Sequence, residues 1–254
     1  MKVIDVSKYN GSINWDKVAK NCDGAIIRAG YRGYDVGKLV TDPEFKKNIA
    51  GATAAGVPIG VYFVTQAISV EEAKEEAQYT VKLVKGYKLA FPIFVDSEDG
   101  NIKATGRADR GKLSKTKRTE ILKAFCDEIT KAGYISGIYT GEYWLKTYLD
   151  ESKLKKYYLW VAKYSKSKPS TSFNAWQYTD AGKINGITGK VDISDFSPIS
   201  KPKTKKKTNA EIADEVIAGK WSSGDDRKKK LEAAGYDYRT IQDLVNKKLK
   251  GGKK

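Results

Sequence analysis

The feature that most restricts the fold of this chain is the regular alternation of β-rich and helical segments in its first half. Strands are expected at residues 2–7, 24–31, 58–64, 91–98 and 136–141. Amphipathic helices are expected between them, at about 43–56, 69–85 and 114–132. The connections are short, and this order is typical of parallel βα units. The fold class is therefore α/β.

The pattern changes after residue 150. Three more strands are expected at 157–164, 174–179 and 189–196, with connections that are too short for full helices. Eight strands in this order predict a TIM-like β/α barrel in which the last three crossovers lack ordinary helices. An open, doubly wound sheet is the alternative arrangement.

The C-terminal part of the chain has a different composition. Residues 198–207 are rich in Lys and Pro, which indicates a linker after a first domain of residues 1–197. Thr208 and Glu211 then form a capping box at the start of a helix, and two further helices follow. Residues 208–250 are therefore predicted to form a small three-helix bundle with a minimal core.

The absence of histidine from all 254 residues restricts the chemistry. It excludes Ser-His-Asp and Cys-His nucleophilic sites, HExxH metalloproteases and His-rich zinc sites. Cys22 and Cys126 are too few for a Cys-based zinc or iron–sulfur site. Two unpaired buried thiols are expected, with one disulfide as the alternative. Hydrolytic chemistry would therefore rest on carboxylates, Tyr, Lys, Ser or an oxygen-ligated metal.

The net charge of +16 predicts attraction to a polyanion, unless the lysines serve only solubility. Nucleic acid is not favoured, because the sequence contains no helix-turn-helix, RNP or Gly-rich phosphate signature. No apolar run reaches the length of a membrane span, so no membrane insertion is expected. The first residues, MKVIDVSKYNG, lack the apolar stretch of a signal peptide. An anionic cell wall is the favoured polyanion.

Four acidic residues could meet at one end of the barrel. Asp96 and Glu98 end the fourth strand, where residues two apart point to the same face. Active sites of parallel barrels lie at these C-terminal strand ends, and a pair of carboxyl groups is what glycoside hydrolysis requires. Asp5 and Asp192 lie in the first and last strands, which are neighbours in a closed barrel. Two solvated acids at a loop, or an Mg²⁺ or Ca²⁺ site, are the alternatives; the prediction is catalysis without metal or cofactor.

Aromatic side chains cluster near the same strand ends. Sugar rings present apolar faces that stack on aromatic rings, and an amide side chain can bind sugar hydroxyl groups. Packing in the core is the alternative role for each. The candidate substrate-binding residues are Tyr31, Tyr62, Tyr139, Trp176 and Gln177.

Together these motifs resemble those of the family 25 glycoside hydrolases, the Chalaropsis-type lysozymes (N-acetylmuramidases) found among phage endolysins and bacterial autolysins. The resemblance rests on DVSKYNG near the start, GVYF, the strand ending DSE, WQY and a final VDISDF, in that order within residues 1–197. It implies a flattened eight-stranded barrel with five early helices. It also implies cleavage of the β-1,4 bond between N-acetylmuramic acid and N-acetylglucosamine in bacterial peptidoglycan.

By motif position, Glu98 is similar to the general acid of that family. Asp96 matches the acid that assists the acetamido group or the oxocarbenium ion, and Asp5 and Asp192 match the remaining two acids. Many relatives carry a histidine after the tyrosine of the third strand, where this chain has Phe63. That difference affects expected subsite contacts and leaves the acids unchanged.

The tail resembles a short cell-wall-binding repeat found at the C-terminus of some phage lysozymes. The marks are GKW, GDDR, LEAAGYDY and IQDLVN. The resemblance implies binding of the muropeptide unit, with Trp221, Gly224 and Arg227 in the matching turn as candidates; Trp221 could instead only fill the small core. One copy implies weak monovalent binding unless the protein forms a homodimer through this module.

The sequence therefore predicts an endolysin that hydrolyses the peptidoglycan of the cell wall. A catalytically weak wall-binding protein is the alternative. Synthesis in a host cytoplasm, followed by holin-type release or action from outside, fits the missing signal peptide. The stereochemical outcome is not settled by the estimated carboxylate spacing, and retention assisted by the substrate's 2-acetamido group is the preferred hypothesis.

Overall fold

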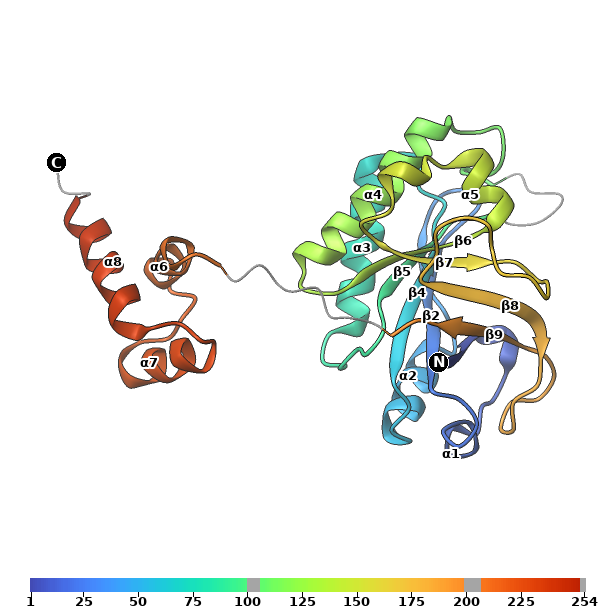
Figure 1. Cartoon of the computed structure of the whole chain (residues 1–254), viewed down its shortest axis with the longest axis horizontal. Helices are drawn as coiled ribbons and strands as arrows, with labels where there is room; N and C mark the ends of the chain where they lie inside the picture. The colour runs from blue at the N-terminus through green and yellow to red at the C-terminus, as the bar shows by residue number, and fades with distance from the viewer. Residues whose placement is uncertain (100–105, 199–206, 252–254) are drawn as a thin grey trace. The chain divides into compact units, whose positions relative to one another are not determined.

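The computed structural model describes residues 1–99, 106–198 and 207–251 (Figure 1). The chain divides into two compact units, Met1–Ser200 and Lys201–Lys254. The predicted linker at 198–207 falls largely on residues outside the described ranges.

The first unit is a closed barrel of eight strands (Figure 1). The order around the barrel is β1, β9, β8, β7, β6, β5, β4 and β2, and pairing between β1 and β2 closes it. A short strand, β3 (Leu39–Thr41), is added to β2 outside this ring. The barrel strands are β1 (Lys2–Val6), β2 (Gly24–Arg32), β4 (Ile59–Val64), β5 (Ile93–Asp96), β6 (Ser136–Gly141), β7 (Tyr158–Ala162), β8 (Ala175–Gly182) and β9 (Val191–Phe196). The predicted eight-stranded barrel is confirmed, and the open-sheet alternative is wrong.

The last strand runs in the opposite direction to its neighbours. β9 is antiparallel to both β8 and β1, whereas the other neighbouring pairs of barrel strands are parallel. The connection from β8 to β9 spans residues 183–190, which is too short for a crossover that would return the chain in parallel. The start of β9 therefore lies at the barrel end where β1 finishes, and Asp192 is directly opposite Asp5.

Five α-helices are described in the barrel unit, and they lie in the connections that precede β7. Ser69 and Ser114 cap two of them, each accepting a hydrogen bond from a backbone N–H of the first turn. The β6–β7 crossover holds only a seven-residue helix and a 3-10 turn, and the next two connections have no α-helix in the described chain. This confirms the expected change in the last three crossovers. The helices are α1 (Trp15–Val18), α2 (Phe45–Ala54), α3 (Val70–Val84), α4 (Lys115–Lys131) and α5 (Glu142–Tyr148).

Alternation along the strands divides the apolar side chains into two cores. The larger core lies between the barrel and its helices. The smaller core fills the barrel interior with mostly aromatic rings, and Phe94 lies 5.1 Å from Trp160 between ring centroids. Because these aromatic rings fill the barrel interior below the mouth, the polar side chains on the same strand faces gather at the mouth.

The second unit is the predicted three-helix bundle, formed by α6 (Asn209–Ile217), α7 (Gly224–Ala233) and α8 (Tyr238–Gly251). Thr208 and Glu211 form the expected reciprocal capping box. A small core joins the three helices, with Ile212, Leu231 and Ile241 almost fully buried. Across residues 1–99, 106–198 and 207–251, no helix is both long and apolar enough to span a membrane.

Candidate active site

The four predicted acids meet at the barrel mouth. Asp5 and Asp192 face each other across the β1–β9 ladder, Asp96 is the last residue of β5, and Glu98 follows two residues later. Asp5 and Asp96 are 7% and 4% exposed, whereas Glu98 is open to solvent. The site therefore has buried carboxyl groups behind an accessible one.

Burial raises the pKa of each of these acids, and neighbouring negative charges add to the rise. Dehydration at the crowded mouth, followed by the charges of Asp192 and Asp99, raises the pKa of Glu98 to about 7. Burial, and then the charge of Glu98, raises the pKa of Asp96 well above its usual value. A carboxyl group with a pKa near neutrality can hold a proton at physiological pH and release it during reaction.

Asp5 and Asp192 act as a hydrogen-bonded pair. Burial and the charge of Asp192 raise the pKa of Asp5 well above its usual value, and the hydrogen bond between them raises it further. Burial also raises the pKa of Asp192, but the same hydrogen bond lowers it. Of the two acids, Asp5 therefore has the stronger tendency to hold a proton.

Arg28 is a buried cation beside the acids. Its Nε donates to Asp42 Oδ2 at 2.6 Å, and its guanidinium carbon lies 5.0 Å from the ring centroid of Tyr9 and 5.9 Å from that of Tyr31. Its charge lowers the pKa of Asp96. Arg28 was not among the predicted site residues, although an arginine inside the apolar run GAIIRAG requires a buried partner.

Gln177 fixes the position of Asp5. Its Nε2 donates to Asp5 Oδ2 at 2.8 Å, while its Oε1 accepts from the hydroxyl groups of Tyr139 at 2.8 Å and Tyr164 at 3.0 Å. Because two hydroxyl donors occupy the amide oxygen, the amide N–H must face Asp5. Gln177 is 1% exposed and Tyr139 7% exposed. Both were predicted to bind substrate; their side chains are buried and hydrogen-bonded within the protein, and substrate binding stays a prediction.

The remaining predicted aromatic residues lie in different places. Tyr62 is inside the barrel, where burial and the charge of Asp5 raise its pKa well above the usual value. Tyr31 is half-buried at the mouth beside Arg28. Trp176 lies away from the acids, because it alternates along β8 with the inward-facing Gln177, and its indole N–H donates to the Lys163 carbonyl at 2.8 Å. Substrate binding by Trp176 stays a prediction.

Three further tyrosines, which were not among the predicted site residues, surround the mouth. Tyr9 is 80% exposed over Arg28, and Tyr164 hydrogen-bonds to Gln177. Burial, and then the charges of Asp96 and Glu98, raise the pKa of Tyr34 to about 12. Each of the three follows the end of a barrel strand by two to three residues, and that position was the available signal.

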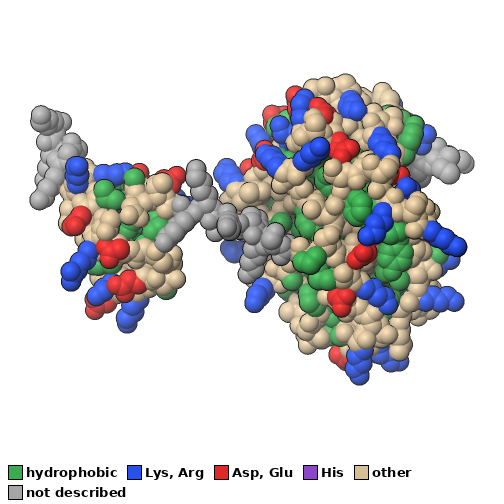
Figure 2. Space-filling view, viewed as in Figure 1, with side chains coloured by type: hydrophobic (Ala, Val, Ile, Leu, Met, Phe, Trp, Pro, Cys, Tyr) green, Lys and Arg blue, Asp and Glu red, His purple; other side chains and the backbone are tan. Residues whose placement is uncertain are grey.

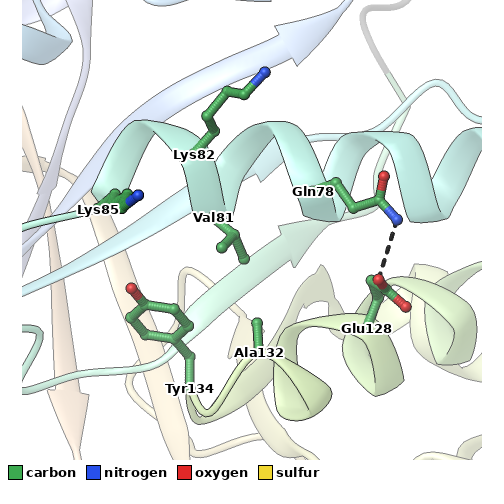
Figure 3. Close-up of a pocket in the computed structure, with 7 residues that line it drawn as sticks. All are labelled: Gln78, Val81, Lys82, Lys85, Glu128, Ala132 and Tyr134. Atoms are coloured by element: carbon green, nitrogen blue, oxygen red, sulfur yellow. Dashed lines mark hydrogen bonds between the residues drawn. The ribbon is translucent and has the colours of Figure 1, made fainter. Parts of the chain in front are cut away.

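Other hollows lie away from the acids. One cavity of about 500 Å³ between α3 and α4 is lined by Val81, Lys82 and Tyr134 among others, and there Gln78 donates to Glu128 at 3.1 Å (Figure 3). Among the described residues, no group of three or more His, Cys, Asp or Glu side chains is arranged to hold a metal ion.

The candidate binding turn of the second unit is held internally. Arg227 Nε donates to the carbonyl groups of Trp221 at 3.3 Å and Ser222 at 3.1 Å. The indole N–H of Trp221 donates to Glu215 at 3.1 Å. Gly224 has a φ of 56°, in the left-handed region that glycine favours. Arg227 therefore shapes this turn, and binding by these residues stays a prediction.

Comparison with known proteins agrees with this geometry. The family model for glycosyl hydrolases family 25 matches residues 4–187, and that for the CW_7 repeat matches residues 210–249. The "Autolytic lysozyme" of Clostridium acetobutylicum is 28% identical over 199 residues, covering 78% of this chain and 56% of the relative. The "Lysozyme" of Streptococcus phage Cp-7 is 24% identical over 258 residues, covering 90% and 71%.

Solved structures give the same result. The modular autolysin LytC from Streptococcus pneumoniae matches with a TM-score of 0.66 and 33% identity, over 76% of this chain and 46% of LytC. The lysozyme from Streptomyces coelicolor matches with a TM-score of 0.66 and 27% identity, over 77% and 91%. The chain spans about half the length of the clostridial relative and of LytC. The chain belongs to glycosyl hydrolases family 25.

Proposed function

We propose that this protein is a muramidase that hydrolyses the β-1,4 bond between N-acetylmuramic acid and N-acetylglucosamine in bacterial peptidoglycan. The observation that carries the proposal is the cluster of four acids, in which an accessible Glu98 has a pKa of about 7 in front of a buried Asp96. The relatives that this chain matches are lysozymes and an autolysin by name, which supports the same substrate class.

Glu98 acts as the general acid in this proposal. It is the acid open to solvent, and so the one that a glycosidic oxygen reaches first. Transfer of its proton to the leaving oxygen breaks the bond to C1 and leaves positive charge on the ring. The raised pKa keeps the proton in place until the substrate is bound.

Asp96 stabilises the charge that develops. Burial is the main cause of the raised Asp96 pKa. When Glu98 and Asp5 hold protons, the added repulsion from their charges is relieved, and Arg28 then favours the ionised form. Asp96 Oδ1 is buried and has no hydrogen-bond partner among the described residues. This oxygen is available to accept the N–H of the substrate's 2-acetamido group, which orients the acetamido oxygen towards C1.

Retention of configuration follows from that arrangement. The acetamido oxygen bonds to C1 as the leaving group departs with the proton of Glu98. Water then attacks C1, returns its proton to Glu98 and restores the acetamido group. Product analysis by NMR immediately after cleavage should show the β-anomer first; initial α-anomer would contradict the assisted route.

The reducing ends of digested peptidoglycan test the activity. New reducing ends should be N-acetylmuramic acid, and new N-acetylglucosamine ends would contradict the proposed bond. Glu98→Gln keeps the side-chain shape and removes the proton, so release should fall by at least ~10²-fold with unchanged thermal unfolding. Glu120→Gln, an exposed change on α4, is the matched control. A protein that binds walls but releases no ends would support the weak wall-binding alternative.

The CW_7 unit is proposed to bind the muropeptide part of the same wall. One repeat offers one contact, and association of two chains through this unit would make the binding bivalent. The proposed site of action is the bacterial cell wall, and holin-type release or action from outside stays a prediction of the sequence analysis. Peptidoglycan pull-down of wild type and Arg227→Ala checks the unit: loss of the turn contacts should reduce binding, and equal binding would contradict its role.

A further inference from the structure

The outer face of β8 and β9 forms an open hollow. In the described chain, the connections after β7 and β8 contain no α-helix that could cover these strands (Figure 1). In Figure 2, hydrophobic side chains bordered by basic and acidic ones are open to the viewer over this region. The hollow has a volume of about 660 Å³, within the range of small-ligand sites. Its lining includes Lys2, Ser165, Lys166, Trp176, Tyr178 and Asp195.

An aromatic pair forms the apolar part of this hollow. Trp176 and Tyr178 lie two residues apart on β8, with ring centroids 5.6 Å apart and planes at 61°. Both are half-buried, so their positions are fixed by packing. The indole N–H of Trp176 already donates to the Lys163 carbonyl. What Trp176 offers to a ligand is therefore ring surface and no hydrogen-bond donor.

Polar groups of both signs border the pair. Ser165, Lys166 and Lys2 are exposed, and the Asp195 side chain is 56% exposed although it also accepts a hydrogen bond from the Met1 amino group. Ring surface with hydroxyl, ammonium and carboxylate groups around it suits a ligand that is apolar on one face and carries hydroxyl or amide groups at its edge. A sugar of the N-acetylhexosamine class has this form.

We propose that the hollow is a second saccharide-binding site, which takes a glycan segment of the cell wall at a distance from the catalytic acids. The identity of this glycan rests on the proposed function. Gln177 points to Asp5 inside the barrel, and Trp176, its neighbour on β8, points to the hollow outside. A contact outside the mouth keeps the enzyme on an insoluble polymer between cleavages by raising its effective concentration there.

Fluorine NMR of the full-length Glu98→Gln protein labelled with 5-fluorotryptophan tests this binding. The chain has five tryptophans, whose signals are assigned by single Trp→Phe changes. Titration with the β-1,4-linked trimer of N-acetylglucosamine should shift the Trp176 signal saturably. Buried Trp160, 4.5 Å from Tyr139 between ring centroids, reports occupancy of the catalytic mouth.

The possible outcomes distinguish failure of the second-site proposal from failure of the muramidase proposal. A shift of Trp160 without Trp176 would overturn the second site and leave the muramidase proposal standing. A Trp176 shift that depends on protein concentration alone would show self-association and would also overturn it. If the Trp176 signal shifts saturably but the wild-type protein releases no reducing ends from peptidoglycan, the muramidase proposal would be wrong and the saccharide site would stand.

Kinetics provides a second test. Tyr178→Ala removes one ring, so saccharide affinity at the hollow should fall by roughly 2- to 10-fold, the range of one aromatic contact. Release from insoluble walls should fall with it, whereas turnover of soluble fragments too short to reach both sites should be unchanged. Tyr143→Ala, which removes a 71% exposed ring on α5, is the control. Equal wall activity in Tyr178→Ala and wild type would contradict the proposal.

Discussion

At the residue scale, a change at Asp99 can alter the pKa of Glu98 without changing any of the four proposed catalytic acids. Asp99 adds negative charge near Glu98, and Arg110 pairs with Asp99 through its side chain and its backbone N–H. Asp99→Asn removes that charge and frees a cation, and both changes favour ionised Glu98. The pKa of Glu98 should fall, so the alkaline limb of the activity profile should move to lower pH.

The shift should be on the order of half a pH unit or less, because solvent screens charges at an exposed site. Soluble-fragment turnover between pH 5 and 9 measures it. Asp99→Glu retains the charge and should keep the wild-type profile. Movement of the Asp99→Asn limb to higher pH would contradict the coupling.

A single amide group, that of Gln177, orients Asp5 and accepts hydrogen bonds from two tyrosine hydroxyl groups. Gln177→Met fills a similar volume but leaves Asp5 without its donor and the buried Tyr139 hydroxyl group without its acceptor. We expect a loss of about 1–3 kcal/mol in the free energy of unfolding and a fall in kcat larger than any rise in KM.

Urea unfolding and kinetics on soluble fragments check these two effects. Gln78→Met, an exposed change on α3, is the matched control: it removes only the solvent-accessible hydrogen bond to Glu128, so it should cost less stability than Gln177→Met and leave kcat unchanged. A rise in KM with an unchanged kcat would mean that Gln177 contacts substrate, as the sequence analysis first predicted.

At the element scale, a buried ion pair joins β2 to α3. Arg32 Nε donates to Glu76 Oε1 at 2.8 Å, and Glu76 is completely buried. Burial raises the pKa of Glu76 to about 7, while its hydrogen bond to Thr65 and its pairing with Arg32 lower it. The helix therefore docks on the barrel through a carboxylate that needs its cation.

Arg32→Leu should destabilise the protein by about 3 kcal/mol at pH 8, where the unpaired Glu76 must be buried charged or take up a proton. The loss should be smaller at pH 5. There, below the folded-state pKa, Glu76 is already protonated in both proteins and the charge no longer needs a partner.

Urea unfolding of Arg32→Leu, Glu76→Leu and the double variant at the two pH values checks this. The double variant should recover part of the loss at pH 8, because no unpaired charge remains. A deficit for Arg32→Leu that is larger at pH 5 than at pH 8 would contradict the role of the pair.

At the scale of the whole molecule, the two units divide charge and chemistry. Residues 201–254 carry 16 Lys and Arg against 8 Asp and Glu, so half of the net charge lies in that segment. The four acids all lie in the first unit. A chain of residues 1–200 should therefore fold and hydrolyse soluble fragments at close to the full-length rate, but act more slowly on intact cells.

Salt distinguishes the two reasons for that slower action. Attraction of a basic segment to an anionic wall is screened beyond about 8 Å at physiological ionic strength. If charge dominates, full-length activity on cells should fall with added salt to that of residues 1–200. If the CW_7 unit recognises muropeptide, a gap should persist at high salt. Equal lysis by both chains at every salt concentration would contradict a targeting role.

The sequence by itself determined the eight barrel strands and the four acids. Period-two patterns and short connections are local properties, so they predicted eight strands and the change of pattern after residue 150. The DSE motif at a strand end likewise predicted the placement of Asp96 and Glu98 at the mouth. These features depend on neighbours in the chain, which the sequence states directly.

Only the tertiary structure decided which faces meet. The direction of β9 depends on its pairing with both β1 and β8, and that pairing brings Asp192 opposite Asp5. Trp176 and Gln177 are adjacent in sequence, yet only closure of the barrel determines which of them faces inward. The β1–β9 pairing and the Gln177–Asp5 contact join residues more than a hundred positions apart, and their energies depend on burial and charge that exist only once the barrel has closed.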